Sequence, residues 1–304
     1  MQATTSTIVR YTAWLGMQGT VGAESLQQYY SSINKYFRDH QRQPVALGEM
    51  VADARRGLAI QQERLAAEDV RVALTAPVAA DILNTAIGFR QTLVWEPANI
   101  ADIRAFRAAL ATITAYVFLC RAESGISCET GDLVVDRPSG SILLYVRKQK
   151  GDQRTRVSAK PLINLPIAAV PDFADLLDWY TVSRDAYCRR FYGASPPPKF
   201  WSISPLESSA TWSVSATLTE WLREAYLAAG ARPPTGFKWT SHSLRKGAAS
   251  AASCVGVPLP AIKHMGDWSK NSEVVTGKYI DPTMRPTPAA WRFFGWLVPV
   301  RPPA

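Results

Sequence analysis

The residues best suited to do chemistry lie between Thr240 and Ser250, where the chain reads Thr-Ser-His-Ser-Leu-Arg-Lys-Gly-Ala-Ala-Ser. Ser241 or Ser243 can cap a helix that begins here. His242 and Arg245 are three residues apart, so they share a face near the positive end of that helix. An imidazole, a guanidinium and free backbone N–H groups in one place predict a binding site for one phosphate group. Taken alone, the segment favours a simpler alternative, a capped helix whose arginine makes a surface salt bridge.

The composition is that of a globular protein with a basic body. The chain has 304 residues, 47% of them hydrophobic and 19% charged, which is enough for one large domain or two unequal ones. Residues 1–76 carry a net charge of +1, and the remaining residues carry +8. A basic body suits a polyanion such as nucleic acid, although many basic proteins bind none.

Several other classes of protein find no support in the sequence. The four cysteines show no C-x-x-C pairing, so we expect reduced, mostly buried thiols in an intracellular protein. No apolar run approaches the roughly 20 residues that cross a membrane, and the N-terminus lacks the pattern of a signal peptide. Metal-ligand spacing and a phosphate-binding G-x-x-x-x-G-K-[ST] loop are both missing, so we expect neither a metal nor another cofactor.

Hydrophobic periodicity predicts a mainly helical chain with one small antiparallel β-meander, which is an α+β class. The helices are expected at residues 24–39, 46–60, 77–87, 102–120, 171–190, 213–229 and about 260–266. The strands are expected at residues 132–135, 142–146 and from residue 156 onward. The tip between the last two strands carries Lys148, Lys150 and Arg154.

The pattern also predicts two domains, a small helical one at residues 1–75 and a larger one at residues 76–304. Arg55 and Arg56 lie on the side of the second helix of the small domain that is opposite its apolar residues. The tail after Pro286 is dense in aromatic residues among prolines. Such a tail either packs on its own domain or is donated to a neighbouring protomer.

Several of these signals occur in the order of one family, and the chain resembles the tyrosine recombinases, also called phage integrases. The matching segments are Arg121-Ala-Glu-Ser, Lys150-Gly-Asp-Gln, His242-Ser-Leu-Arg245, Gly266-Asp-Trp268 and Tyr279. The amino-acid sequences of these segments are most similar to those of enzymes of eukaryotic mobile elements such as DIRS-type retrotransposons and Cryptons. Residues 1–75 resemble the helical, SAM-like core-binding domain that precedes the catalytic domain in this family. The likeness covers nearly the whole chain.

The resemblance implies a site-specific recombinase, in which a tyrosine oxygen attacks a DNA phosphodiester and forms a 3′-phosphotyrosyl link without metal or ATP. Tyr279 would be this nucleophile, and His242 would bind a phosphate oxygen and help to take the phenolic proton. Arg121 and Arg245 would bind the phosphate, because a guanidinium matches its oxygens bidentately. Trp268 would offer its indole N–H to the same phosphate.

The remaining roles fall on basic side chains. Lys150 is the candidate general acid for the leaving 5′-oxygen, and Lys148 is a rival for the same role. His264 precedes the glycine of Gly266-Asp-Trp268, and we interpret it as a surface histidine. The side chains expected to contact DNA are Arg55, Arg56, Lys148, Arg154, Lys246 and Lys270.

The partners implied by the resemblance are double-stranded DNA and further copies of the chain, arranged as a tetramer on two sites and joined by the C-terminal tail. The reaction would integrate or excise a mobile element, in the nucleus for a eukaryotic element and otherwise in the cytoplasm. Two alternatives stay open: a catalytically inactive DNA-binding protein of the same fold, and a DNA-relaxing enzyme like type IB topoisomerases. The first is favoured by Ser124, which stands where the family has an acid, and by a longer gap between Trp268 and Tyr279.

Overall fold

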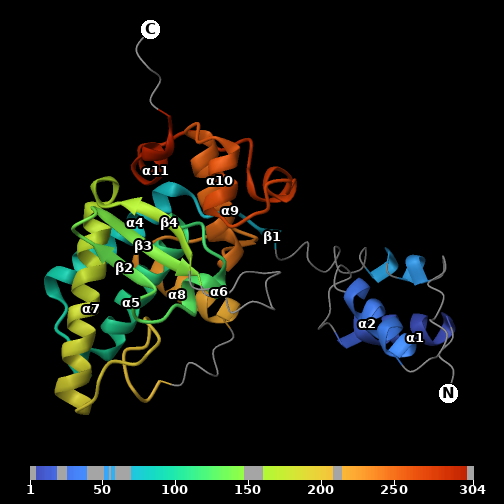
Figure 1. Cartoon of the computed structure of the whole chain (residues 1–304), viewed down its shortest axis with the longest axis horizontal. Coiled ribbons are helices and arrows are strands. Elements are labelled where there is room, and N and C mark those ends of the chain that lie inside the picture. The colour runs from blue at the N-terminus through green and yellow to red at the C-terminus, as the bar shows by residue number, and fades with distance from the viewer. Residues whose placement is uncertain are drawn as a thin grey trace, which may run out of the picture. The chain divides into compact units, whose positions relative to one another are not determined.

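The computed structural model describes residues 5–18, 26–39, 51–54, 56–58, 70–146, 160–207 and 214–299. The chain divides into two compact units, Met1–Val70 and Arg71–Ala304 (Figure 1). The sequence pattern predicts a boundary at residue 75. Residues 71–75 go with the second unit because Leu74 is fully buried in its core.

The described part of the first unit is helical. Helix α1 spans Thr5–Gln18, α2 spans Leu26–Asp39, and residues 51–54 and 56–58 are also helical. Their shared core consists of Ile8, Leu15, Leu26, Tyr30, Val51 and Leu58. The predicted helix at residues 24–39 is confirmed. Helix α1 is not predicted, because the β-branched residues at its start favour strands when taken by themselves.

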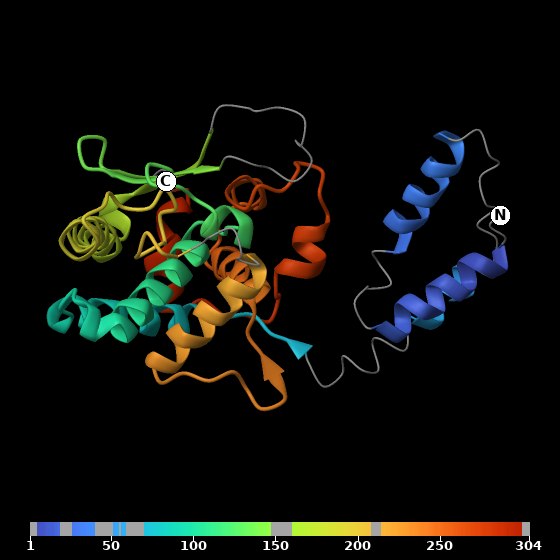
Figure 2. The same ribbon diagram turned by 90° about the horizontal axis from the view of Figure 1, so that it is seen from below.

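Helices also form most of the second unit. The long ones are α4 (Ala76–Thr92), α5 (Ile100–Val117), α7 (Pro171–Tyr192), α8 (Val214–Ala228) and α9 (Ser241–Cys254). The short ones are η1 (Pro97–Asn99), α6 (Ala122–Ile126), η2 (Ile167–Ala169), α10 (Leu259–Met265), η4 (Val275–Tyr279), α11 (Pro288–Phe294) and η5 (Gly295–Leu297). Helix α5 is central: each residue from Phe106 to Val117 is buried, and α4, α8 and α9 pack around it (Figure 2).

A three-stranded antiparallel sheet lies on one side of these helices, next to α7 (Figure 1). Its strands are β2 (Leu133–Asp136), β3 (Ser141–Val146) and β4 (Lys160–Pro166), in that order across the sheet. Leu144 pairs with Leu133 on one side and with Ile163 on the other. The predicted meander is therefore confirmed, and the α+β class with it. A second, two-stranded pairing joins β1 (Val70–Arg71) to β5 (Phe237–Lys238) and is not predicted.

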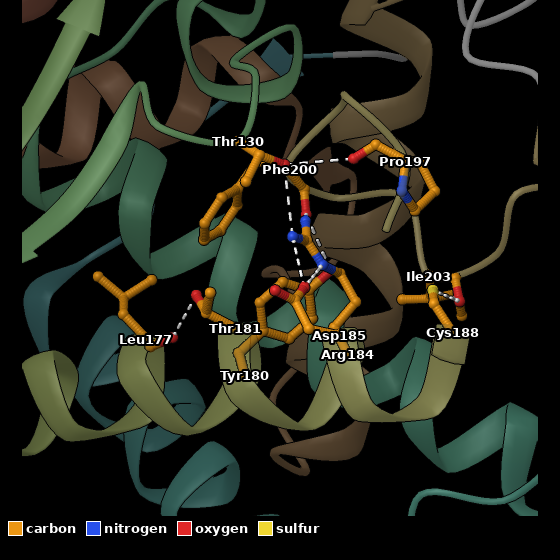
Figure 3. Close-up of polar contacts among 10 residues, drawn as sticks. All are labelled: Thr130, Leu177, Tyr180, Thr181, Arg184, Asp185, Cys188, Pro197, Phe200 and Ile203. Carbon is orange, nitrogen blue, oxygen red and sulfur yellow. Dashed lines mark hydrogen bonds and ion pairs between the residues drawn. The ribbon is translucent and has the colours of Figure 1, made fainter. Parts of the chain in front are cut away.

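The segment of residues 193–207, which follows α7, is held by a fully buried arginine of that helix (Figure 3). Arg184 Nη1 donates to the carbonyl oxygen of Phe200 at 2.5 Å, and Nη2 donates to Thr130 Oγ1 at 3.3 Å. Thr130 Oγ1 in turn donates to the carbonyl oxygen of Pro197 at 3.2 Å, and Asp185 balances the buried charge at 2.8 Å. Because these groups are shielded from water, the arginine fixes the segment strongly.

The aromatic tail packs on its own unit. Phe293 and Phe294 of α11 are fully buried, and their ring centroids lie 5.6 Å and 5.8 Å from that of Tyr116 in α5. Thr287 caps α11 by accepting a hydrogen bond from the Ala290 N–H at 3.1 Å. The described residues 287–299 therefore pack against the second unit, and exchange of the tail between protomers stays a prediction.

Candidate active site

The start of α9 is fixed by polar contacts to α8. Thr240 is the N-cap residue, and its backbone N–H donates to Ser243 Oγ at 3.0 Å. The N–H of Ser241 donates to Thr219 Oγ1 at 3.1 Å, and the hydroxyls of Ser241 and Ser215 lie 3.0 Å apart. The prediction that Ser241 or Ser243 is the cap is therefore wrong, because both residues lie inside the helix. Both still stabilise its first turn.

The backbone just before α4 passes directly over α9. The N–H of Leu74 donates to the carbonyl oxygen of Ser243 at 3.0 Å. A Cβ atom on Gly247 would lie 1.8 Å from the carbonyl oxygen of Leu74. Only glycine permits this approach, which holds the helix carrying His242 and Arg245 in place.

Arg245 is 3% exposed and is held by two backbone carbonyls from other parts of the chain. Nη1 donates to the carbonyl oxygen of Leu119 at 3.1 Å, and Nη2 donates to that of Gly266. Leu119 and Asp267 have φ of 48° and 53°, and among the described residues they are the two non-glycine residues in the left-handed region. Such backbone costs about 1–3 kcal/mol and is concentrated at functional sites.

Arg121 contacts the backbone next to Gly266, which is one of the two groups that hold Arg245. It follows α5 and is half-buried, and its Nη2 lies 3.5 Å from the carbonyl oxygen of Asp267. Its Nη1 is buried, yet no group in the described part of the chain accepts a hydrogen bond from it. A buried donor of this kind costs free energy unless a ligand accepts its hydrogen bond.

The fold positions Arg121 through the segment that Arg184 holds. The indole N–H of Trp201 donates to the carbonyl oxygen of Gly125 at 2.6 Å. Gly125 lies in α6, and its own N–H donates to the carbonyl oxygen of Arg121 at 3.1 Å. The short helix α6, which is not predicted, follows Arg121 directly and precedes strand β2.

The two guanidinium groups influence each other electrostatically. Burial, followed by the charge of Arg121, lowers the pKa of Arg245 to about 10, which still leaves it protonated at neutral pH. Burial raises the pKa of the nearby Asp267 carboxyl, while Arg121 and Arg245 act in the opposite direction. Two close cations in a partly desolvated place form a site that an anion would stabilise.

Trp268 covers Arg245. The Arg245 Cζ atom lies 3.7 Å from the centroid of the Trp268 ring, which is half-buried. The turn needs glycine at position 266, because a Cβ there would lie 1.8 Å from the indole. The same indole meets the ring of Tyr279 edge-on at 5.1 Å between centroids.

Tyr279 is the last residue of η4, a single π-helical turn. Its hydroxyl oxygen lies 3.4 Å from His242 Nδ1, and its ring centroid lies 5.6 Å from the Arg245 Cζ atom. The contact is long for a hydrogen bond. Isolated π-turns are rare and occur mostly at functional sites, and periodicity does not reveal them.

The structure thus brings together Arg121, His242, Arg245, Trp268 and Tyr279 from three separate stretches of chain. Lys150, its rival Lys148, Arg154 and Arg55 lie outside the described residues, so the general acid has no structural placement here. The sequence gives no sign of the role of Leu119, whose carbonyl oxygen holds Arg245, and assigns no role to Asp267 or Ser250 within the segments that it singles out. Their position beside the predicted side chains becomes visible only in the folded chain.

The other predicted DNA contacts lie on surfaces. Arg56 is exposed and pairs with Asp53 at 3.3 Å, and Lys246 is half-buried on α9. Lys270 is exposed, and its carbonyl oxygen accepts a bond from Lys263 Nζ at 2.8 Å. His264 is exposed, as expected of a surface histidine.

A groove of about 660 Å³ opens beside the start of α9 and includes His242 in its wall. Its lining contributes three cationic side chains, Arg71, Arg223 and Lys238, against one carboxylate, Glu220. Sequence reasoning did not single out these three cations, because they come from β1, α8 and β5. Their charge suits a polyanion next to the candidate site.

No helix in the described part of the chain is both long and apolar enough to span a membrane. Among the same residues, no set of three His, Cys, Asp or Glu side chains is placed to hold a metal ion.

Comparison with solved structures finds likenesses to an integrase and to recombinases. One is a lambda integrase (75–356) dimer bound to a COC′ core site, 20% identical, covering 93% of this chain and 82% of that chain at a TM-score of 0.48. A second is XerA recombinase, 14% identical, covering 95% and 80% at a TM-score of 0.44. A third is a lambda integrase tetramer bound to a Holliday junction, 20% identical, covering 94% and 67% at a TM-score of 0.45. No family model matches the chain, and no curated protein matches it.

Proposed function

We propose that the protein is a site-specific DNA recombinase that cleaves and rejoins DNA through a 3′-phosphotyrosyl intermediate. One observation carries the proposal: Tyr279 lies within reach of His242 and beside the Arg245 guanidinium. Arg121 and Arg245 both contact the backbone at Gly266 and Asp267. A phenol, a base and two guanidinium groups are what phosphoryl transfer to a tyrosine requires.

The two arginines supply the charge for the phosphate. Arg121 Nη1 and Arg245 Nε are both buried, and no described residue accepts a hydrogen bond from either atom. A phosphodiester oxygen would satisfy these donors and relieve the repulsion between the two cations. The charge that grows on a five-coordinate phosphorus would strengthen both contacts, and donors of this kind each contribute about 3–4 kcal/mol to a transition state.

The tyrosine and the histidine supply the covalent step. The Tyr279 oxygen forms a bond to phosphorus while the bond from phosphorus to the 5′-oxygen breaks. The phenolic proton passes to His242 Nδ1, which requires the tautomer with its proton on Nε2. The leaving 5′-oxygen takes a proton from a general acid, for which Lys150 and Lys148 are the candidates. The phosphotyrosyl bond conserves the energy of the broken link, so joining needs no ATP.

DNA binding by the wider surface is part of the proposal. The groove beside α9 would accept backbone phosphates next to the cleaved one, through Arg71, Arg223 and Lys238. The first unit would act as a core-binding domain on the same duplex. We further propose that several copies act together, as a tetramer on two sites, to integrate or excise a mobile element, in the nucleus if that element is eukaryotic.

The experiment is incubation with a suicide half-site, a nicked duplex that loses its 5′-hydroxyl strand after cleavage. We expect a covalent protein–DNA adduct on a denaturing gel without added metal, with the attached peptide containing Tyr279. Tyr279→Phe should abolish the adduct and keep the DNA affinity within about twofold, because only the nucleophile is lost. Tyr192→Phe, at the end of α7, is the matched control and should react like the wild type.

Other outcomes select the alternatives. Tight, salt-dependent DNA binding without any adduct would favour a DNA-binding protein of this fold that lacks the chemistry. Relaxation of supercoiled DNA without joining of two partners would favour an enzyme like type IB topoisomerases.

A further inference from the structure

Ser250 of α9 is fully buried and contacts the backbone on both sides of the Tyr279–Asp281 segment. Its hydroxyl donates to the carbonyl oxygen of Tyr279 at 3.0 Å, and it accepts the N–H of Asp281 at 2.8 Å. A serine hydroxyl can do both at once, because it has one donor and two acceptor sites. We propose that Ser250 is a positioning residue for the tyrosine nucleophile, an inference that rests on the proposed function.

The need for such an anchor follows from how η4 ends. The last carbonyls of a helix have no partner within the helix, and the chain leaves η4 in an extended conformation at Ile280. Within η4, Val275 is the one buried side chain, at the opposite end from Tyr279. Tyr279 and Ile280 are only partly buried, so the two hydrogen bonds of Ser250 add to the limited packing at this end of the turn.

The side chain of Tyr279 is held less firmly than its backbone. Its hydroxyl has the 3.4 Å contact to His242, and its ring meets Trp268 edge-on. The place of the phenolic oxygen therefore depends on the backbone from which the ring projects. In-line attack tolerates little error, since a shift of about 1 Å can slow such a reaction by about a hundredfold.

Ser250 also links the nucleophile to the phosphate-binding residues. It lies on the same helix as His242, which contacts the Tyr279 hydroxyl, and Arg245, which faces the Tyr279 ring. One rigid helix thus carries the base, one guanidinium and the anchor of the nucleophile. Their spacing is then preserved when the surrounding loops move.

The test uses the full-length chain with Ser250→Ala and Ser250→Cys. A thiol is close to a hydroxyl in size but bonds more weakly, so the single-turnover rate of adduct formation should rank wild type, then Cys, then Ala. We expect Ser250→Ala to lower that rate at least tenfold, with the Kd for the half-site and the Tm little changed. Ser202→Ala is the control, because Ser202 is equally buried and no described group bonds to its hydroxyl.

Two further readouts separate positioning from a merely structural role. The His242→Ala change should slow the Ser250→Ala variant by a smaller factor than it slows the wild type, because the phenol of that variant no longer meets the base. Hydrogen exchange of the Asp281 amide should rise at least tenfold, while amides within α9 keep their protection.

Each remaining outcome decides between the proposals. An adduct rate within twofold of wild type would overturn the positioning role, and so would a loss that only follows a fall in Tm and in DNA binding. If the wild type forms no adduct, the proposed recombinase fails. The exchange of the Asp281 amide would still show whether Ser250 holds the segment, and unchanged exchange would reject the anchor by itself.

Discussion

The guanidinium of Arg245 lies over the indole of Trp268, with its Cζ atom 3.7 Å from the ring centroid. Two backbone carbonyls, from Leu119 and Gly266, accept hydrogen bonds from its two Nη atoms. The cation–π contact and the carbonyls leave little freedom to the group. Its position is therefore set before any phosphate arrives, which is how a preorganised site lowers the barrier of a reaction.

The first prediction concerns this fixed fork. Arg245→Lys keeps a positive charge but loses the planar donors that reach Leu119 and Gly266 together. We expect the rate of adduct formation on a suicide half-site to fall by about a hundredfold or more. Arg292→Lys, which changes a surface arginine paired with Asp172, should react normally. Equal rates for Arg245→Lys and wild type would show that the fork has no role in cleavage.

The second prediction concerns the close approach of Leu74 to α9. Gly247→Ala places a Cβ 1.8 Å from a backbone oxygen that cannot rotate away. We expect a loss of about 2 kcal/mol or more in the free energy of unfolding, measured with urea. Gly88→Ala is the contrast, since its Cβ meets nothing within 4 Å in the middle of α4. That variant should be more stable by about 0.5–1 kcal/mol.

The third prediction concerns the buried arginine of α7. Arg184→Met removes the shorter of two hydrogen bonds to the carbonyl oxygen of Phe200, which keeps the one from the Tyr180 hydroxyl, and it removes the ion pair to Asp185 (Figure 3). We expect a loss of about 3–5 kcal/mol in the free energy of unfolding. Arg137→Met removes exposed pairs to Asp175 and Asp178 and should cost about 1 kcal/mol at most. Similar losses for both variants would contradict the buried role.

The fourth prediction concerns pH. Burial raises the pKa of Asp267 above its ordinary 3.8, so its charged form is disfavoured in the folded state. The resulting cost is present at neutral pH and disappears once the pH falls below 3.8, where the carboxyl is protonated in both states. Asp267→Asn should therefore be more stable than wild type at pH 7, and this advantage should shrink steadily on acidification. Urea unfolding at a series of pH values measures the difference, and an advantage that grows in acid would reverse the sign.

Much of the architecture can be predicted from the sequence, because it rests on local periodicity. The helices at residues 24–39, 171–190 and 213–229 and the three-stranded meander follow from the spacing of apolar residues and from turn residues. The sequence also shows that His242 and Arg245 share a helix face and that a glycine lies two residues before Trp268. These features depend on residues close together in the chain.

The site itself was decided by the tertiary structure. The pKa of Arg245 is lowered by burial and by the charge of Arg121, which is far away in sequence. Ser250 likewise bonds to the backbone of Tyr279 and Asp281 across a long stretch of chain. The left-handed backbone at Leu119 has no local signal, whereas Asp267 is of a residue type that adopts this region more readily than most. The sequence by itself determined which side chains were available for phosphate chemistry. Only the folded chain decided which of them meet, because desolvation and hydrogen bonding across long loops depend on packing that no local pattern encodes.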